Sequence, residues 1–338
     1  MINKNIYVNA SNCHQGGGKT LLDAFISGIS DNEINYYFFI DKRYNPPIIY
    51  DKNIVFQKVN IFERLFVTRR IKQMCFTDDI ILYFGNLPPI AKFKKNKVIL
   101  LLSNRFYVDN ISYNGFSIRD KIKISLEKMY FNLKKNNVHE IIVQTNTMKN
   151  LTAKILPNVP IKILPFENSS FKKSETFIKE PQTFMYVASL IPYKNHQILL
   201  YAWLNLKNEG KTPKLFLTID QNNSLKKWIK FFIIKNSLNV VLLENLDRTE
   251  LLNIYKKCEY LIYPSTFEAY GLPLIEASNY GLKILAADLD YCWDLITPYD
   301  FFNPYDSTSV SRCVLRNITS KTFINPIYSP KDFISKLL

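Results

Sequence analysis

Short apolar runs alternate with helical patterns along this whole chain. In the first half, this alternation predicts strands at residues 5–9, 36–40, 54–56, 80–84, 98–102, 141–143 and 161–164. In the second half, it predicts strands at residues 183–187, 215–219, 240–243, 260–263 and 282–286. Continuous apolar runs such as 98–102 suit parallel strands covered by helices on both faces. The pattern therefore predicts an α/β protein with two doubly wound parallel sheets.

Helical patterns fill most of the intervals between these runs. They are expected at residues 21–29, 61–74, 113–135, 223–235 and 306–318, with a short helix at 330–338. Asn146 or Thr147 is the expected N-cap of the helix that follows residues 141–143. Asp247 or Thr249 is the expected N-cap of a helix that runs through Tyr255.

A polar stretch at residues 165–182 divides the chain into two parts. It is rich in Ser, Lys and Glu and has no clear period, which is typical of a linker. A length of 338 residues fits two domains at about 150 residues each. We expect domains at residues 1–166 and 183–325, and a separate C-terminal segment at 326–338.

Composition excludes several classes of protein. The five cysteines are scattered and never spaced C-x-x-C, which favours reduced cytosolic thiols over disulfides or a zinc site. No apolar run approaches the ~18–20 residues of a membrane-spanning helix. The first residues lead into a strand and do not resemble a signal peptide.

Charge is concentrated in the first half. Residues 1–165 hold 24 Lys and Arg against 12 Asp and Glu, whereas the remainder holds 20 against 17. Basic segments with interleaved aromatic residues lie at 92–97 and 113–135. An anionic membrane surface is the expected partner of this half, and a solvated helix face is the competing interpretation. None of the usual nucleic-acid motifs is present, so no nucleic-acid partner is expected.

The most informative stretch is residues 263–278, which read YPSTFEAYGLPLIEAS. The strand at 260–263 ends at Pro264, and Gly271 opens a helical pattern with an apolar face. A helix start that follows a strand is a ready anion site, because its free N–H groups and its dipole favour negative charge. Gly271 has no Cβ, so a phosphate could approach its backbone closely.

Two carboxylates, Glu268 and Glu276, flank this anion site. An acid beside a phosphate site is costly unless it serves something else, and sugar and ribose hydroxyls are suitable partners. The phrase F-E-A-Y-G-L-P-L-I-E-A resembles the Glu-x7-Glu signature of retaining transferases of glycosyltransferase family 4, also called group 1. The competing interpretation is an ordinary strand–loop–helix unit with two solvated glutamates.

This resemblance implies a fold and a set of site residues. The fold is GT-B, in which two Rossmann-like domains face a central cleft and the chain's end can cross back to the first domain. The resemblance implies that Glu268 contacts the donor sugar and Glu276 holds the ribose. It also implies that the backbone of Tyr270, Gly271 and Leu272 meets the diphosphate, and that Leu246 lies near the nucleobase.

Residues 188–196 resemble the family's Gly-Arg-Leu-x-x-x-Lys segment, whose cations grip the diphosphate. Lys194 matches the family's Lys, whereas Ser189 stands at the position of its Arg. A substitute cation would then have to come from Arg105 or Lys19. The catalytic pair implied by the resemblance is Glu268 and Lys194.

Three consecutive glycines, Gly16, Gly17 and Gly18, follow the first strand and precede Lys19. A P-loop would need a glycine at position 13, where this chain has Cys13, so that motif does not match. In GT-B transferases the corresponding loop lies across the cleft from the donor phosphates and near the acceptor. Gly17 and Gly18 are therefore expected near the donor, and Gly16 and Lys19 near the acceptor.

The loop after residues 98–102 contains Asn104 and Arg105, which are further expected cleft residues. It has neither the His nor the Asp that related enzymes often carry there, so no general base is assigned. A retaining transferase needs none if the leaving phosphate accepts the acceptor's proton. Asp288 and Asp290 form a weak D-x-D match and are interpreted as turn residues, so no metal and no cofactor are expected.

The function expected from the sequence is retaining transfer of a hexose from a UDP- or GDP-sugar to a saccharide acceptor. A lipid-linked saccharide in surface polysaccharide synthesis fits the basic first half. The protein is expected in the cytoplasm, peripheral on the inner membrane face. The alternatives are a catalytically silent GT-B-like protein that binds nucleotide or saccharide and, less favoured, a P-loop NTPase.

Overall fold

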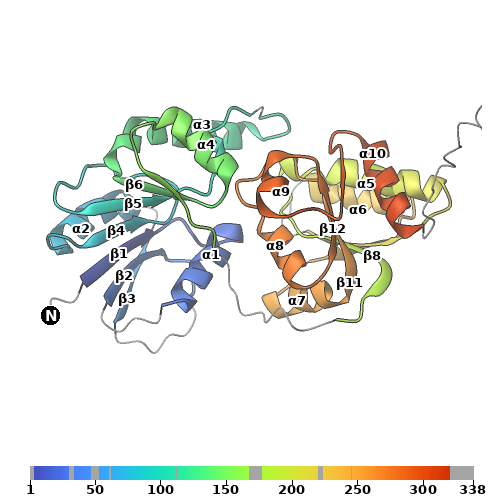
Figure 1. The fold of residues 1–338 in the computed structure, drawn as a ribbon, viewed down its shortest axis with the longest axis horizontal. Coiled ribbons are helices and arrows are strands. Elements are labelled where there is room, and N and C mark those ends of the chain that lie inside the picture. Colours follow the sequence, from blue (N-terminus) through green and yellow to red (C-terminus); the bar gives the residue numbers. More distant parts are fainter. Residues whose placement is uncertain are drawn as a thin grey trace, which may run out of the picture.

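The computed structural model describes residues 4–29, 34–46, 53–60, 62–111, 113–166, 177–219, 224–244 and 246–319. The two α/β domains lie side by side, and each is built on one parallel sheet (Figure 1). The predicted pair of doubly wound domains is therefore confirmed. In the part of the chain that the structure describes, no helix is long and apolar enough to cross a bilayer.

The first domain has a seven-stranded sheet in the order β3-β2-β1-β4-β5-β6-β7. Its strands are β1 (Lys4–Ala10), β2 (Ile34–Asp41), β3 (Ile54–Val59), β4 (Ile80–Tyr83), β5 (Lys97–Leu101), β6 (Glu140–Val143) and β7 (Ile161–Ile163). Its α-helices are α1 (Gly16–Ser27), α2 (Val67–Met74), α3 (Ile118–Lys134) and α4 (Asn146–Ile155). Short 3-10 turns lie at η1 (Glu63–Phe66), η2 (Arg105–Tyr107) and η3 (Lys135–Asn137).

The second domain has a six-stranded sheet in the order β10-β9-β8-β11-β12-β13. Its strands are β8 (Glu180–Tyr186), β9 (Lys214–Thr218), β10 (Val240–Leu243), β11 (Cys258–Tyr263), β12 (Lys283–Ala287) and β13 (Asp300–Phe302). Its helices are α5 (His196–Asn208), α6 (Ser224–Lys235), α7 (Arg248–Lys257), α8 (Leu272–Asn279), α9 (Asp290–Leu295) and α10 (Ser307–Ile318), and η4 spans Pro192–Lys194.

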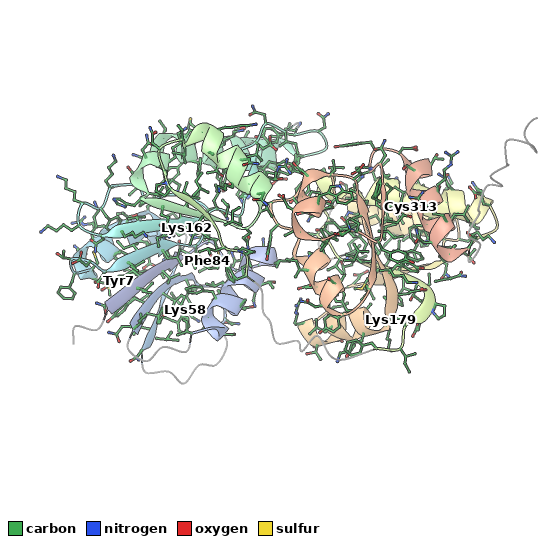
Figure 2. The ribbon with its side chains drawn as sticks, viewed as in Figure 1. Tyr7, Lys58, Phe84, Lys162, Lys179 and Cys313 are labelled. Atoms are coloured by element: carbon green, nitrogen blue, oxygen red, sulfur yellow. The ribbon has the colours of Figure 1, made fainter. Side chains whose placement is uncertain are left out.

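Each sheet is held by apolar packing on both faces. In the first domain, Tyr7 faces one cluster with Ile81 and Leu100, and Val8 faces another with Leu22 and Phe38. Alternate residues of a strand point to opposite faces, so a strand with both faces covered reads as a continuous apolar run. Buried Phe84 and Cys313 lie in the two different domains (Figure 2).

Strand order reverses at one place in each sheet, between β1 and β4 and between β8 and β11. Loops at the carboxyl ends of such strands run in opposite directions, and ligands of open α/β sheets bind in the opening that they leave. In the second domain, these loops carry residues 187–194 and 264–271. In the first domain, they carry residues 11–15 and 84–86. The topology alone therefore brings together most segments in which the sequence suggested a site.

Several predicted boundaries were wrong, each for a local reason. Helix α1 begins at Gly16 rather than at residue 21, because Lys19 N donates to Gln15 O (3.4 Å) and closes a first turn over the glycines. The low helix propensity of glycine had suggested a loop. The predicted helix at 61–74 is split into η1 and α2, and the one at 113–135 begins at Ile118 behind the N-cap Ser117.

The N-cap of α4 is Thr145, not Asn146 or Thr147, since its Oγ1 accepts from Met148 N (3.2 Å). Of the two predicted caps of α7, Asp247 is the N-cap, and it forms a reciprocal capping box with Glu250. Strand β8 begins at Glu180, so residues 180–182 are not linker, and β13 and α9 were not predicted. Residues 167–176 of the predicted linker, Asn223 of the predicted helix 223–235 and the segments at 326–338 and 330–338 lie outside the described residues.

Candidate active site

The loop between β11 and α8 forms the centre of the candidate site. Gly271, at the N-cap of α8, has φ +76°, and a Cβ there would lie 3.2 Å from Leu274 Cδ1. A residue with a Cβ is therefore disfavoured at this position on two grounds. Among the described residues, no hydrogen-bond acceptor is found for the N–H groups of Gly271 and Leu272. This helix start can consequently donate two hydrogen bonds to an anion.

A second helix start, that of α1, faces the first one across the domain boundary. A Cβ on Gly17 would lie 3.7 Å from Leu272 Cδ1, and α1 and α8 lie next to one another (Figure 1). Neither helix has a side-chain cap or an acidic residue in its first turn. Since each helix start carries about half a positive charge, the two together favour a ligand with more than one negative charge.

Glu268 and Lys194 form an ion pair beside these helix starts. Lys194 Nζ contacts Glu268 Oε1, and the two side chains are 12% and 10% exposed. They are 74 positions apart in the sequence. They meet because Lys194 follows β8 and Glu268 follows the neighbouring strand β11. Because the pair is mostly buried, each charge depends on the other for compensation.

Two tyrosine residues orient this ion pair. Tyr263 Oη donates to Glu268 Oε1 (2.8 Å), and Tyr186 Oη donates to Lys194 O (2.6 Å). Burial, followed by the charge of Glu268, raises the pKa of Tyr263 well above its ordinary value. The phenol therefore keeps its proton and remains a donor to the carboxylate.

Glu276 is held by two residues of the neighbouring helix α7. Arg248 Nη2 lies 2.7 Å from Glu276 Oε1, and Tyr255 Oη donates to Oε2 (3.0 Å). A carboxylate has about four acceptor positions, so about two remain for a ligand. Leu246 is half-buried, just before the N-cap of α7. The second domain thus presents an oriented carboxylate and an apolar side chain on adjoining elements.

Arg105 connects the two domains and is fully engaged. It forms a bidentate ion pair with Asp290 (2.8 and 2.7 Å), donates to Asp109 (2.8 Å) and donates to the backbone oxygen of Glu268 (3.3 Å). Its guanidinium carbon lies 4.9 Å from the centre of the Phe267 ring. These contacts leave little donor capacity for a diphosphate, so Arg105 is not a suitable substitute for the missing Arg.

The remaining acceptor-side residues have local partners. Lys19 pairs with Asp23 (2.6 Å) and lies 5.5 Å from the centre of the Tyr44 ring. Asn104 caps η2, with Oδ1 accepting from Phe106 N (3.0 Å). Gly16, at φ +60°, is exposed at the start of α1.

The interpretation of Asp288 and Asp290 as turn residues holds for Asp288, which lies in the bend between β12 and α9, but it is wrong for Asp290. Asp290 is the first residue of α9 and binds Arg105 of the other domain. Asp288 accepts from Trp293 Nε1 of α9 (2.9 Å), five positions further along the chain. The pair therefore has structural contacts that sequence spacing could not indicate.

Further contacts hold the domains together around the site. Thr145 Oγ1 donates to Ala269 O (3.2 Å), and Thr147 N donates to Asp294 Oδ2 (2.7 Å). Phe106 of the first domain packs against Phe267 of the second, with ring centres 4.8 Å apart. These contacts hold η2 and the start of α4 in the first domain against the loop 264–271 and α9 in the second.

His196, the residue that begins α5, is buried behind Lys194. It is 1% exposed, and neither ring nitrogen has a hydrogen-bond partner in the ranges that the structure describes. Its ring centre lies 5.1 Å from that of Tyr186. Burial, followed by the charge of Lys194, lowers the pKa of His196 to about 3.

This burial predicts acid sensitivity of the fold. Between pH 6.5 and about 3 the unfolded chain binds a proton at His196 that the folded chain does not, so stability rises with pH across that window. At pH 5 the free energy of unfolding is expected to be lower than at neutral pH by about 2 kcal/mol because of His196. In His196→Phe this part of the pH dependence should disappear, as measured by urea unfolding at pH 7 and pH 5. Exposed His139→Gln is the control, and an unchanged pH dependence in His196→Phe would refute the assignment.

Sequence reasoning missed Arg248, Tyr255 and Tyr263. Arg248 could have been found from the sequence, because it directly follows the predicted N-cap Asp247 and begins the helix that also carries Tyr255. Tyr263 ends a predicted strand, and nothing in its sequence context shows that its hydroxyl reaches Glu268. The roles of Arg248 and Tyr255 depend on the packing of α7 beside α8, which spacing does not reveal.

Comparison with known proteins confirms the resemblance inferred from the sequence. Residues 167–321 match the family model described as glycosyl transferases group 1. Protein CapJ of Staphylococcus aureus is 25% identical over 138 residues, which is 40% of this chain and 35% of CapJ. The serotype-specific mannosyltransferase WbdA of Escherichia coli is 20% identical over 235 residues, which is 67% of this chain and 29% of WbdA. The chain thus spans about a third of the length of these relatives.

The whole fold also has counterparts among solved structures. That of Anabaena HepE, in complex with UDP and glucose, has a TM-score of 0.65 and 13% sequence identity. The similarity covers 94% of this chain and 90% of HepE. At this identity it shows the fold alone, which is GT-B, as predicted. The second half of the chain is thus similar to the group 1 glycosyl transferases, and the two domains together have the GT-B fold.

Proposed function

We propose that this chain is a retaining glycosyltransferase, which moves a hexose from a nucleotide-sugar to a saccharide acceptor. The observation that carries the proposal is the Lys194–Glu268 pair beside two uncapped helix starts. The matches to group 1 glycosyl transferases and to WbdA and HepE support the same reaction class. The donor is a UDP- or GDP-sugar, since the relatives include a mannosyltransferase and a UDP complex.

The departing diphosphate is the group that this arrangement suits. Negative charge develops on it as the bond to the sugar breaks. The N–H groups of Gly271 and Leu272, the start of α1 and Lys194 would stabilise that charge in the transition state. These groups replace a metal ion in our proposal, which therefore includes no metal and no cofactor.

The two glutamates would hold the two ends of the donor. Glu276, oriented by Arg248 and Tyr255, would accept hydrogen bonds from the ribose hydroxyls. Glu268, oriented by Tyr263, would contact the donor sugar. Tyr270, Leu246, Gly17 and Gly18 complete the proposed donor site.

In the proposed reaction the acceptor oxygen attacks the anomeric carbon on the face from which the diphosphate leaves. The bond between that carbon and the phosphate oxygen breaks, and the acceptor's proton passes to the same phosphate oxygen. Configuration is thereby retained without a protein base. The acceptor would lie against Gly16, Lys19, Asn104 and Arg105 of the first domain.

The first domain also offers a surface suited to an anionic membrane. Along α3 five apolar side chains are exposed, at Ile118, Ile122, Leu126, Met129 and Leu133. The same helix carries Arg119, Lys121, Lys123, Lys128 and Lys134. An exposed apolar stripe with basic flanks suits binding to anionic lipid. We therefore propose a peripheral position on the cytoplasmic membrane face, where a lipid-linked acceptor would be available.

A transfer assay tests the proposed reaction. The chain is supplied with UDP-glucose or GDP-mannose and short saccharide acceptors, in the presence of EDTA. We expect release of UDP or GDP and a product whose new linkage has the α configuration of the donor, as read by proton NMR. A β-linked product would refute retention, and release that requires a divalent metal would refute the metal-free site.

A further inference from the structure

A cluster of charged residues lies at the carboxyl end of β2, outside the proposed donor site. Asp41, 2% exposed, accepts from Arg43 Nε (2.9 Å) and Arg43 Nη2 (3.0 Å). Arg64, in η1, contacts the same carboxylate through Nη2. His14, from the loop after β1, lies 3.5 Å from Arg43 Nη2. We call His14, Asp41, Arg43 and Arg64 the arginine cluster.

The arginine cluster has an uncompensated positive charge. One carboxylate faces two guanidinium groups, and burial, followed by the charges of Arg43 and Arg64, lowers the pKa of His14, which is therefore neutral at pH 7. Lys123 of α3 is close enough to add to this lowering. Arg64 Nε is buried and has no hydrogen-bond partner in the described part of the chain. Burying a charged group without a full set of partners costs free energy, so binding of a second anion would stabilise the cluster.

A short piece of chain links the arginine cluster to the proposed donor site. His14 is three residues before Gly17, whose Cβ position lies 3.7 Å from Leu272 at the start of α8. Asp41 ends β2, which pairs with β1 in parallel. The cluster therefore lies on the ligand-binding edge of the first sheet, in the domain that would receive the acceptor.

We propose that the arginine cluster binds a phosphate group carried by the acceptor. The inference rests on the proposed function, and it narrows the acceptor to a phosphorylated molecule. Arg43 uses its Nε and Nη2 edge to bind Asp41, but no partner among the described residues is found for Nη1 of either arginine. Guanidinium N–H donors suit the oxygens of a phosphate.

The neighbours of Arg64 indicate how such a phosphate could be presented. Phe62, Leu65 and Phe66 are 77%, 68% and 55% exposed. An anion site beside exposed apolar side chains suits a phosphate at a lipid surface. A phosphate on a soluble saccharide has the same chemistry at the arginines, so the experiment separates the two sources.

The test is a calorimetric titration with inorganic phosphate at low salt. Arg43→Gln, at a side chain that is 62% exposed, should weaken phosphate binding at least tenfold. Arg64→Lys, which keeps the charge but removes the planar donor pair, should weaken it as well. Lys42→Gln, an exposed neighbouring lysine, is the control and should change the affinity less than twofold. If Arg43→Gln binds phosphate as the wild type does, or if only Lys194→Ala weakens it, the inference is wrong.

Vesicles then identify the source of the phosphate. Sedimentation with phosphatidylcholine vesicles is compared with and without phosphatidic acid, in the wild type and Arg43→Gln. Loss of phosphatidic acid binding in the variant supports a lipid phosphate, whereas unchanged vesicle binding with weakened inorganic phosphate binding supports a soluble one.

A nucleotide titration in Arg43→Gln separates this inference from the proposed function. If nucleotide binding is unchanged in Arg43→Gln and phosphate binding is unchanged as well, the inference about the arginine cluster is wrong, but the proposed function is not affected. If nucleotides fail to bind the wild type, the proposed function fails, and phosphate binding by the arginines would then have no acceptor role.

Discussion

Replacing Lys194 by alanine is expected to lower the rate of sugar transfer about 10²–10³-fold, the usual cost of losing a fixed electrostatic contact to a transition state. Lys194 forms an ion pair with Glu268, which lies three residues before the uncapped start of α8. Its removal leaves less positive charge for the diphosphate that departs. The loss should fall mainly on kcat, because charge on the diphosphate increases in the transition state. Steady-state release of UDP or GDP measures it.

A fold defect must be separated from a catalytic one. Lys211→Ala, at an exposed lysine of the same domain, should keep wild-type kinetics. Lys194→Arg keeps a charge near Glu268 and should recover part of kcat. Full activity in Lys194→Ala would show that the helix starts alone stabilise the leaving group, contrary to our proposal.

Replacing Glu276 by alanine is expected to weaken nucleotide binding by about one to two orders of magnitude. Hydrogen bonds to a charged acceptor contribute about 1.5–3 kcal/mol each, and each 1.4 kcal/mol is a factor of ten. The variant also leaves Arg248 and Tyr255 without their shared partner. Calorimetry with UDP and GDP gives the change in Kd directly.

Glu276→Gln is the matched control for this second prediction. It keeps the shape of the side chain and can still accept hydrogen bonds, but it has no charge for Arg248. We expect an intermediate affinity from Gln. An affinity equal to that of the wild type in both variants would mean that Glu276 only anchors α7 to α8.

The fold was predictable because it depends on local patterns. Apolar runs such as residues 98–102 and 260–263 became β5 and β11, since strands covered on both faces must be apolar throughout. Boundaries were less predictable where packing overrides propensity, as at Gly16, where Leu21, Leu22 and Ile26 anchor the helix that the glycines begin.

The candidate site was predictable only where one short segment carries it. Residues 268–276 lie on a single strand–loop–helix unit, so their spacing indicated their chemistry. Contacts between distant segments could not be predicted in this way. The Arg105–Asp290 ion pair joins residues 185 positions apart, and the two arginines of the arginine cluster meet because β2 and η1 converge on Asp41.

The most direct test of the central claim is a calorimetric titration without added metal. UDP, GDP and ATP are titrated into the wild type and into Glu276→Ala. Our account predicts that UDP or GDP binds the wild type and that the substitution weakens this binding at least tenfold. Binding of ATP alone, with a requirement for magnesium and no effect of the substitution, would contradict a nucleotide-sugar site at α8.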